Sequence, residues 1–124
     1  MKTVMAGGFV TPATIELQRV DSDEVVARVR PDPGDPVFAG HYPGFPLLPG
    51  VHIFEFVDLT VRTAEPDLIL DEIELCRFLL PAGHADDLVV RVRRDGARHR
   101  ATVAAAGGET VAEVVLRYRN GATP

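Results

Sequence analysis

Apolar and polar residues alternate in two short segments of the chain, Thr14–Val20 and Val25–Arg30. A period of two turns every second side chain to the same face, which is typical of a half-buried β-strand. The turn-like run Asp21-Ser22-Asp23 separates the two segments. We therefore expect a β-hairpin here.

The next segment, residues 31–50, breaks this pattern, because its sequence PDPGDPVFAGHYPGFPLLPG is dense in proline and glycine. Proline lacks a backbone donor and has a fixed φ, so the segment can form neither a helix nor a central strand. A loop of this length is unusual in a small domain, and such loops are commonly functional.

From Gly50 the pattern changes to a mostly apolar stretch, VHIFEFVDLTVRT, which ends before Pro66. Its β-branched and aromatic residues would suit a strand, but its length of about 13 residues and its Pro49-Gly50 start favour a helix. Apolar residues fall on nearly all sides, so we expect the helix to be buried all round.

The rest of the chain has the character of strands, in the segments 68–79, 86–94, 97–107 and 109–119. Asp95-Gly96 and Gly107-Gly108 predict hairpin turns between the last three segments. One helix cannot cover both faces of such a sheet, and the apolar alternation of the final strands needs a partner. We therefore expect an α+β hot-dog fold, in which an antiparallel β-sheet wraps around one long central helix and a dimer completes the sheet.

Composition limits the possible classes of protein. At 124 residues, with 46% hydrophobic and 25% charged residues, the chain fits a single soluble domain spanning residues 1–124. The net charge of −5 argues against nucleic acid as a partner. The single cysteine, Cys76, cannot form an intramolecular disulfide or a cysteine-rich zinc site, and we expect it in the core. We expect no signal peptide, no membrane span and a cytoplasmic location.

The run Gly40–Glu55, GHYPGFPLLPGVHIFE, resembles the signature G-H-F-P-G-x-P-x-x-P-G-V-x-x-x-E of the FabZ-type 3-hydroxyacyl-[acyl-carrier-protein] dehydratases. The match keeps the interval of fourteen residues from His41 to Glu55. A second segment, Ile73–Leu88, resembles the family's pattern R-F-x-x-P-V-x-P-G-D-x-L, although His84-Ala85 replaces its Pro-Gly. Together the two segments extend the resemblance over most of the chain.

The resemblance implies dehydration of a 3-hydroxyacyl thioester on acyl carrier protein to the 2-enoyl thioester, in fatty-acid or polyketide and polyene biosynthesis. This elimination needs a base for the Cα proton and an acid for the leaving hydroxyl. We assign His41 as the base, since imidazole titrates near neutrality, and Glu55 as the acid, since burial should raise its pKa. In the resembled family the backbone N–H corresponding to Gly50 stabilises the thioester oxyanion, and the His and Glu of one site come from different subunits.

We expect further residues around this pair to contact the substrate: Phe38, Tyr42, Pro43, Gly44, Pro49, Val51, Phe56, Leu59 and Phe78. Where the family's helix usually reads E-A-x-A-Q, this chain reads Glu55-Phe56-Val57-Asp58-Leu59, which should reshape the acyl tunnel. For that reason we slightly favour a specialised polyketide or polyene role. We expect no metal and no organic cofactor beyond the phosphopantetheine arm of the substrate. The expected partners are acyl carrier protein and a second copy of the chain, as a homodimer or higher homo-oligomer, with a homologous hot-dog subunit as an alternative.

Some of these residues also have simpler interpretations. Glu55 could form a structural ion pair with Arg62 or with an arginine of a strand. The spacing of His52, Glu55 and Asp58 could suggest a metal site, but a single helix offers too few ligands. Asp58 more simply supplies a hydrogen bond that supports the acid, or caps an interface.

We expect two further histidines, His84 and His99, at the solvent. The arginines of the final strands favour a solvated sheet face, with a docking patch for an acidic carrier protein as the weaker alternative: Arg91, Arg93, Arg94, Arg98 and Arg100.

Two other functions stay open. A hot-dog thioesterase or isomerase would also use a carboxylate near a helix start, but it would not need His41. A non-catalytic hot-dog subunit that pairs with an active homologue would need neither His41 nor Glu55. Retention of both residues counts against this third function, while Phe56 and Leu59 keep it open.

Overall fold

The computed structural model describes residues 2–5, 12–31, 47–48, 50–80, 82–83, 87–105 and 107–121, and the side chains of residues 14–30, 53–80, 87–105 and 107–121. Its elements in chain order are β1 (Lys2–Met5), β2 (Pro12–Val20), β3 (Glu24–Pro31), β4 (Leu47–Leu48), α2 (Gly50–Ala64), β5 (Leu68–Phe78), β6 (Ala82–Gly83), β7 (Leu88–Asp95), β8 (Arg98–Ala105) and β9 (Thr110–Asn120). The main sheet has seven strands in the order β1-β2-β3-β7-β8-β9-β5, and β4 and β6 form a separate two-stranded sheet.

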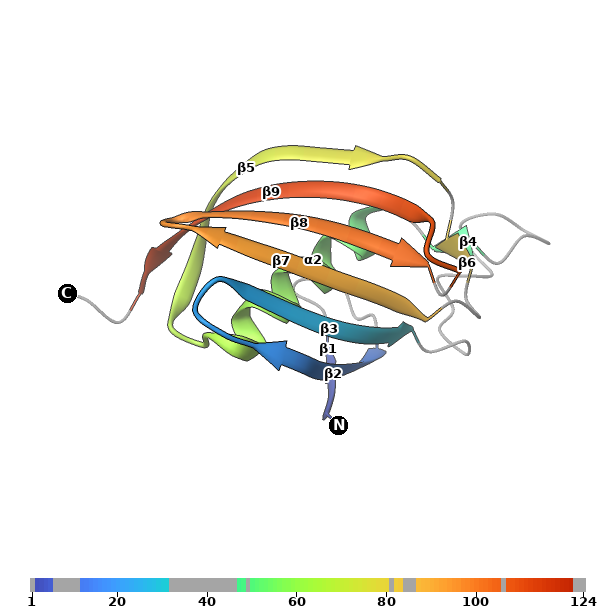
Figure 1. Cartoon of the computed structure of the whole chain (residues 1–124), viewed down its shortest axis with the longest axis horizontal. Helices are drawn as coiled ribbons and strands as arrows, with labels where there is room; N and C mark the ends of the chain where they lie inside the picture. Colours follow the sequence, from blue (N-terminus) through green and yellow to red (C-terminus); the bar gives the residue numbers. More distant parts are fainter. Residues whose placement is uncertain are drawn as a thin grey trace.

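The main sheet is antiparallel and curls around α2 (Figure 1). None of the described side chains of α2, from Ile53 to Ala64, is exposed. The buried hydroxyl of Thr60 donates a hydrogen bond to the carbonyl of Phe56 at 2.8 Å, so this polar group is satisfied within the helix. The expectation of a helix buried all round is therefore only partly met, because Phe54, Asp58 and Arg62, spaced four residues apart, form a half-buried side.

The core lies between α2 and the concave face of the sheet. Alternate residues of the strands turn toward the helix, as a period of two requires. The fully buried side chains include Ile15, Val25, Val29, Phe56, Val57, Val61, Leu88, Val90, Val92, Val103, Val111 and Leu116. The expected hot-dog architecture, with a central helix held in an antiparallel sheet, is therefore confirmed over the residues that the structure describes.

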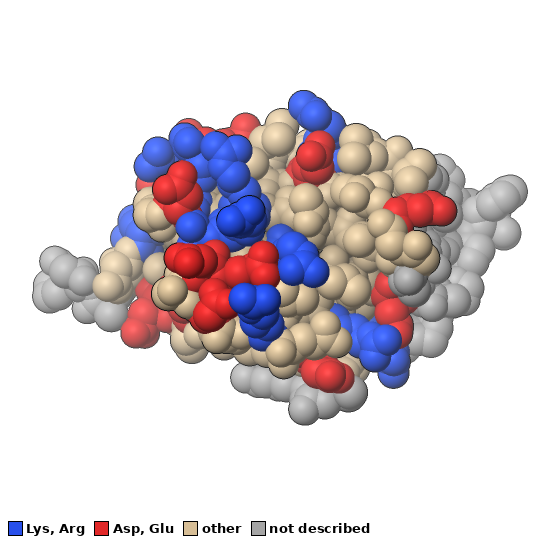
Figure 2. Space-filling view, viewed as in Figure 1, with Lys and Arg blue, Asp and Glu red and all other residues tan. Residues whose placement is uncertain are grey.

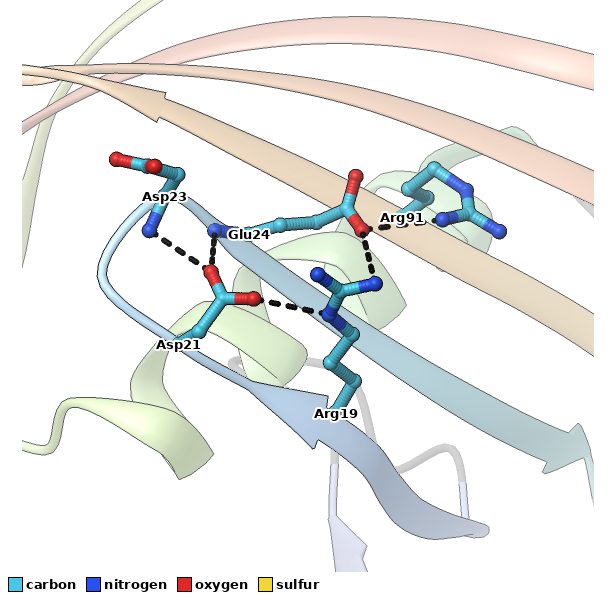
Figure 3. Close-up of polar contacts among 5 residues, drawn as sticks. All are labelled: Arg19, Asp21, Asp23, Glu24 and Arg91. Atoms are coloured by element: carbon cyan, nitrogen blue, oxygen red, sulfur yellow. Dashed lines mark hydrogen bonds and ion pairs between the residues drawn. The ribbon is translucent and has the colours of Figure 1, made fainter.

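All three expected hairpin turns are present. Between β2 and β3, Oδ1 of Asp21 accepts hydrogen bonds from the backbone N–H groups of Asp23 at 2.9 Å and Glu24 at 2.7 Å (Figure 3). Gly96 has a φ of 60° between β7 and β8, and Gly108 has a φ of 92° between β8 and β9. A side chain is strained at such φ values, so glycine is the residue that these turns favour.

Strand β5 lies at one edge of the main sheet and pairs only with β9 among the described strands. Two irregularities in the register, between Leu70 and Glu72 and between Ile73 and Leu75, shift its alternation. As a result, Ile73 lies opposite Leu116 and Phe78 lies opposite Ala112, both inward-facing residues of β9. Cross-strand partners share a face, so the second half of β5 carries apolar side chains on the helix side of the sheet.

The outer face of the sheet mixes acidic and basic residues (Figure 2). Glu24 accepts from Arg91 at 3.1 Å and lies 3.9 Å from Arg19, as drawn in Figure 3. Arg91 therefore fits the expected solvated face. Arg94 does not, because it is half-buried and pairs with Glu65 just after the helix.

Some expectations need correction. Cys76 is exposed rather than in the core, because β5 extends beyond the part of the sheet that α2 covers. His99 is only 4% exposed rather than at the solvent, because its register turns it toward the helix side, opposite Leu116. His84 lies outside the described residues.

The alternation did not predict β1, β4 or β6, which are short and lie in segments without a clear period. In the described part of the chain, no helix has the length and apolarity needed to cross a bilayer.

Candidate active site

Glu55 is a carboxyl group buried on the central helix. It is 8% exposed and lies among Ile53, Phe56 and Leu59, which are buried as well. One of its oxygens, Oε2, is buried and makes no hydrogen bond within the described structure. A buried polar atom without a partner is costly to the fold and is found mainly where function requires it.

The pKa of Glu55 lies above its ordinary value of 4.5, as expected from the sequence. Burial is the largest cause, because it disfavours the charged form. The nearby carboxylate of Asp58 raises the pKa further, and the guanidinium of Arg62 opposes this effect less strongly. The environment of Glu55 therefore favours the protonated carboxyl, which is the form that a general acid needs.

The structural ion pair considered for Glu55 is absent from the described residues. Arg62 pairs instead with Asp58, with Nη2 2.8 Å from Oδ2, and Nε donates to the same oxygen at 3.0 Å. The remaining oxygen of Asp58, Oδ1, accepts a hydrogen bond from the hydroxyl of Tyr118 at 2.6 Å. Asp58 therefore accepts hydrogen bonds from Arg62 and Tyr118, and its expected role in supporting the acid stays a prediction.

Helix α2 begins at Gly50, as the sequence predicts. The first N–H groups of a helix lack partners within it, and they carry the positive end of the helix dipole. The first turn contains no acidic side chain that would neutralise this end. Glu55 follows five residues later, about 7.5 Å further along the helix axis. The helix start at Gly50 and the carboxyl of Glu55 are therefore carried by one rigid element, and their roles stay predictions.

The segments that carry the two sequence resemblances meet in space. Strand β4 lies directly before the helix and pairs with β6, with Leu47 opposite Gly83 and Leu48 opposite Ala82. This pairing brings the end of the proline-rich segment beside the turn that follows β5. The start of α2 and the end of β5 are therefore neighbours.

Several expected site residues lie outside the described residues: Phe38, His41, Tyr42, Pro43, Gly44 and Pro49. Val51 lies in the helix, but its side chain is not described, and the same holds for His52. The pairing of His41 with Glu55 therefore stays a prediction.

The remaining expected substrate contacts differ in burial. Phe56 is fully buried in the core, Leu59 is 8% exposed, and Phe78 is 48% exposed on the helix side of β5. Phe56 thus contributes to packing in the single chain, whereas Phe78 is open to contact. Their roles toward a substrate stay predictions.

A buried polar cluster beside the acid was not predicted from the sequence. Tyr118 is 3% exposed, and its ring meets the ring of His99 edge to face, with centroids 4.8 Å apart. His99 Nδ1 lies 3.2 Å from the carbonyl of Ala97, and burial lowers the pKa of the imidazole. The period of two along β9 turns Val114, Leu116 and Tyr118 to the same face, so an inward Tyr118 was predictable even though its partner was not.

Comparison with known proteins agrees with this geometry. The fold and the helix with its buried acid define a hot-dog protein. The ApeI-like family, described as ApeI dehydratase, matches residues 17–114 of the chain. The chain therefore belongs to the ApeI-like dehydratase family, and the resemblance to FabZ-type dehydratases seen in the sequence is confirmed at the family level.

The relatives include curated FabZ proteins. The 3-hydroxyacyl-[acyl-carrier-protein] dehydratase FabZ of Paramagnetospirillum magneticum is 34% identical over 92 residues, which cover 66% of this chain and 56% of that protein. The FabZ of Anaeromyxobacter sp. is 36% identical over 96 residues, which cover 64% of this chain and 60% of that protein. The chain thus spans less than two thirds of the length of these relatives.

Among solved structures, the dehydratase heterocomplex ApeI:P from Xenorhabdus doucetiae has a TM-score of 0.74 at 21% identity, covering 95% of this chain and 98% of that chain. At this level of identity the likeness shows the fold alone.

Proposed function

We propose that the protein removes water from a 3-hydroxyacyl thioester carried by acyl carrier protein and forms the 2-enoyl thioester. The observation that carries this proposal is the buried Glu55, whose pKa is raised and whose Oε2 has no partner in the described structure. Membership of the ApeI-like dehydratase family supports the same reaction. The product belongs to fatty-acid or polyketide and polyene biosynthesis, in the cytoplasm.

In the proposed reaction, His41 takes the proton from Cα while the protonated Glu55 gives its proton to the departing hydroxyl, which leaves as water. Negative charge that develops on the thioester oxygen is stabilised by the N–H of Gly50 and by the helix dipole. The cycle closes when the proton on His41 returns to Glu55 directly or through solvent. These groups suffice for an elimination, so the proposal needs no metal and no organic cofactor beyond the substrate's phosphopantetheine.

We further propose that two copies of the chain pair through β5, with His41 of one copy facing Glu55 of the other. An edge strand of 11 residues with apolar side chains is an aggregation hazard unless another strand covers it. Ile73 and Phe78 on the helix side of this strand are 50% and 48% exposed, and Leu79 and Leu80, which follow the strand, are 46% and 44% exposed, so together they form an apolar surface. A second copy would bury this surface and extend the sheet.

The function is tested with the purified protein and a 3-hydroxyacyl-acyl carrier protein. We expect a loss of about 18 Da from the acyl group, the mass of one water, followed by mass spectrometry. Either His41→Ala or Glu55→Gln should reduce the rate by at least about a hundredfold, because each removes one side of the acid–base pair. Retained activity in both variants, with folding checked by circular dichroism, would overturn the mechanism.

The same assay separates two competing functions. A thioesterase would release the free acid and the carrier thiol instead of water. A non-catalytic subunit would be inactive alone and would support activity only with a homologous chain. The Xenorhabdus structure, which is named as a heterocomplex, is a reason to test this possibility.

A further inference from the structure

Asp58 lies on the same side of α2 as Glu55, three residues further along the helix. Both of its oxygens are engaged: Oδ1 accepts from Tyr118 at 2.6 Å, and Oδ2 accepts from Arg62 at 3.0 Å and 2.8 Å. Its side chain is only 13% exposed. Contacts from two elements, one of them β9 on the far side of the core, hold this carboxylate in place.

A fixed carboxylate beside a buried carboxyl lowers the stability of the fold, so its presence calls for a functional explanation. Two like charges close together in a partly dehydrated region disfavour the ionised form of one of them. Asp58 has two donors and Glu55 has an oxygen without any, so the negative charge belongs to Asp58. The helix therefore holds one carboxyl whose oxygens both have donors and one whose pKa is raised by burial and by its neighbour.

We propose that Asp58, held by Tyr118 and Arg62, is a positioning residue whose fixed negative charge keeps the proton on Glu55. The inference rests on the proposed function, because it concerns the acid of that reaction. It also identifies one of this chain's departures from the E-A-x-A-Q pattern as functional. In this role Asp58 contacts neither the acid nor the substrate, and it acts on Glu55 through its negative charge.

The other charged and titratable groups near this cluster come from three strands and the helix. On α2, Arg62 opposes the effect of Asp58, but more weakly. Tyr118 of β9 contacts His99 of β8, whose pKa is lowered by burial. Beyond His99, Arg94 of β7 and Glu65 compensate each other in an ion pair. Among the described groups, Asp58 and Arg62 are therefore the two charges that shift the pKa of Glu55, in addition to burial.

The two charges predict shifts of opposite sign. Asp58→Asn should lower the pKa of Glu55, while Arg62→Gln should raise it. Tyr118→Phe keeps the charge of Asp58 but releases one oxygen, so it should give a smaller shift in the same direction as Asp58→Asn. Structural damage to the helix would not produce opposite signs at two residues that bind each other.

The test is a carbon-13 NMR titration of the glutamate carboxyls in the labelled, intact protein. The signal of Glu55 is identified as the one missing in Glu55→Gln. Asp71→Asn is the matched control, because it removes a carboxylate that is 55% exposed on β5 and should leave the titration of Glu55 unchanged. In the dehydration assay, the alkaline limb of the pH profile should move with the titration, toward lower pH in Asp58→Asn.

An unchanged Glu55 titration in a folded Asp58→Asn variant would overturn the inference, as would an equal shift in Asp71→Asn. The NMR measurement does not require turnover. A protein that titrates as expected but does not remove water would therefore contradict the proposed function and leave the inference standing.

Discussion

At the scale of single residues, the burial of Glu55 that suits it to the proposed acid role carries a cost in stability that can be measured. Its pKa in the folded chain lies above the ordinary value of 4.5. Between these two values the folded state binds more protons than the unfolded state, so stability falls as the pH rises through this window. Above the folded pKa the full cost of the buried charge is present.

Glu55→Gln removes this cost, because the amide does not ionise. We expect the variant to melt at a higher temperature than the parent at pH 8, and the difference to shrink as the pH falls toward 4.5. Calorimetry at several pH values measures this. Glu72→Gln, which changes an exposed carboxyl on β5, should show no such trend. A Glu55→Gln variant that is less stable than the parent at pH 8 would contradict the prediction.

Single residues also show where sequence analysis succeeds. The raised pKa of Glu55 was predictable, because a helix with apolar residues on nearly all sides is expected to be buried together with the acid that it carries. The bond between Asp58 and Tyr118 was not, because its partners are 60 positions apart and only the folded sheet brings them together. His99 was misjudged for a similar reason, since its burial depends on the register between β8 and β9.

At the scale of elements, the sequence predicted the helix start and the turns that depend only on the residues at those positions. The helix start at Gly50 and the turns at Gly96 and Gly108 depend on the local backbone, and all three appear in the structure. Strand β1 and the short pair β4 and β6 depend on pairing with distant segments, and the alternation did not show them. Cys76 is exposed for a related reason: its surroundings depend on how far the helix covers β5, which no local pattern records.

Strand β5 also carries a prediction about assembly. Ile73→Asp places a charge on the apolar side of the edge strand, where burial in a dimer would be strongly unfavourable. We expect the dimer to weaken by at least about tenfold, or about 1.4 kcal/mol, measured by sedimentation equilibrium. Val20→Asp is the matched control, because Val20 is equally exposed at 51% but lies on β2 near the hairpin.

The two aspartate variants must give different results for the proposed interface to hold. If both dissociate the dimer, or neither does, the contact lies elsewhere. Loss of the dimer in Ile73→Asp should also reduce dehydration, since each proposed site needs residues from two copies.

At the scale of the whole molecule, the proposal that one site is shared between two copies has a consequence that no single variant can test. In a symmetric dimer, each interface repeats the same contacts twice, so there are two equivalent sites. If His41 of one copy serves Glu55 of the other, a dimer of one His41→Ala chain and one Glu55→Gln chain contains one site with both lesions. Its other site has both catalytic side chains intact.

Mixing the two inactive variants and allowing the subunits to exchange should therefore restore about a quarter of the parent activity, because about half of the dimers are mixed and each has one intact site. If His41 and Glu55 of one site came from the same chain, every site in the mixture would lack one of them and no activity would return. Mixing either variant with itself is the control. Activity should return only when both variants are mixed, and it should not return when each also carries Ile73→Asp. This result would show that the shared site depends on pairing through the edge of β5.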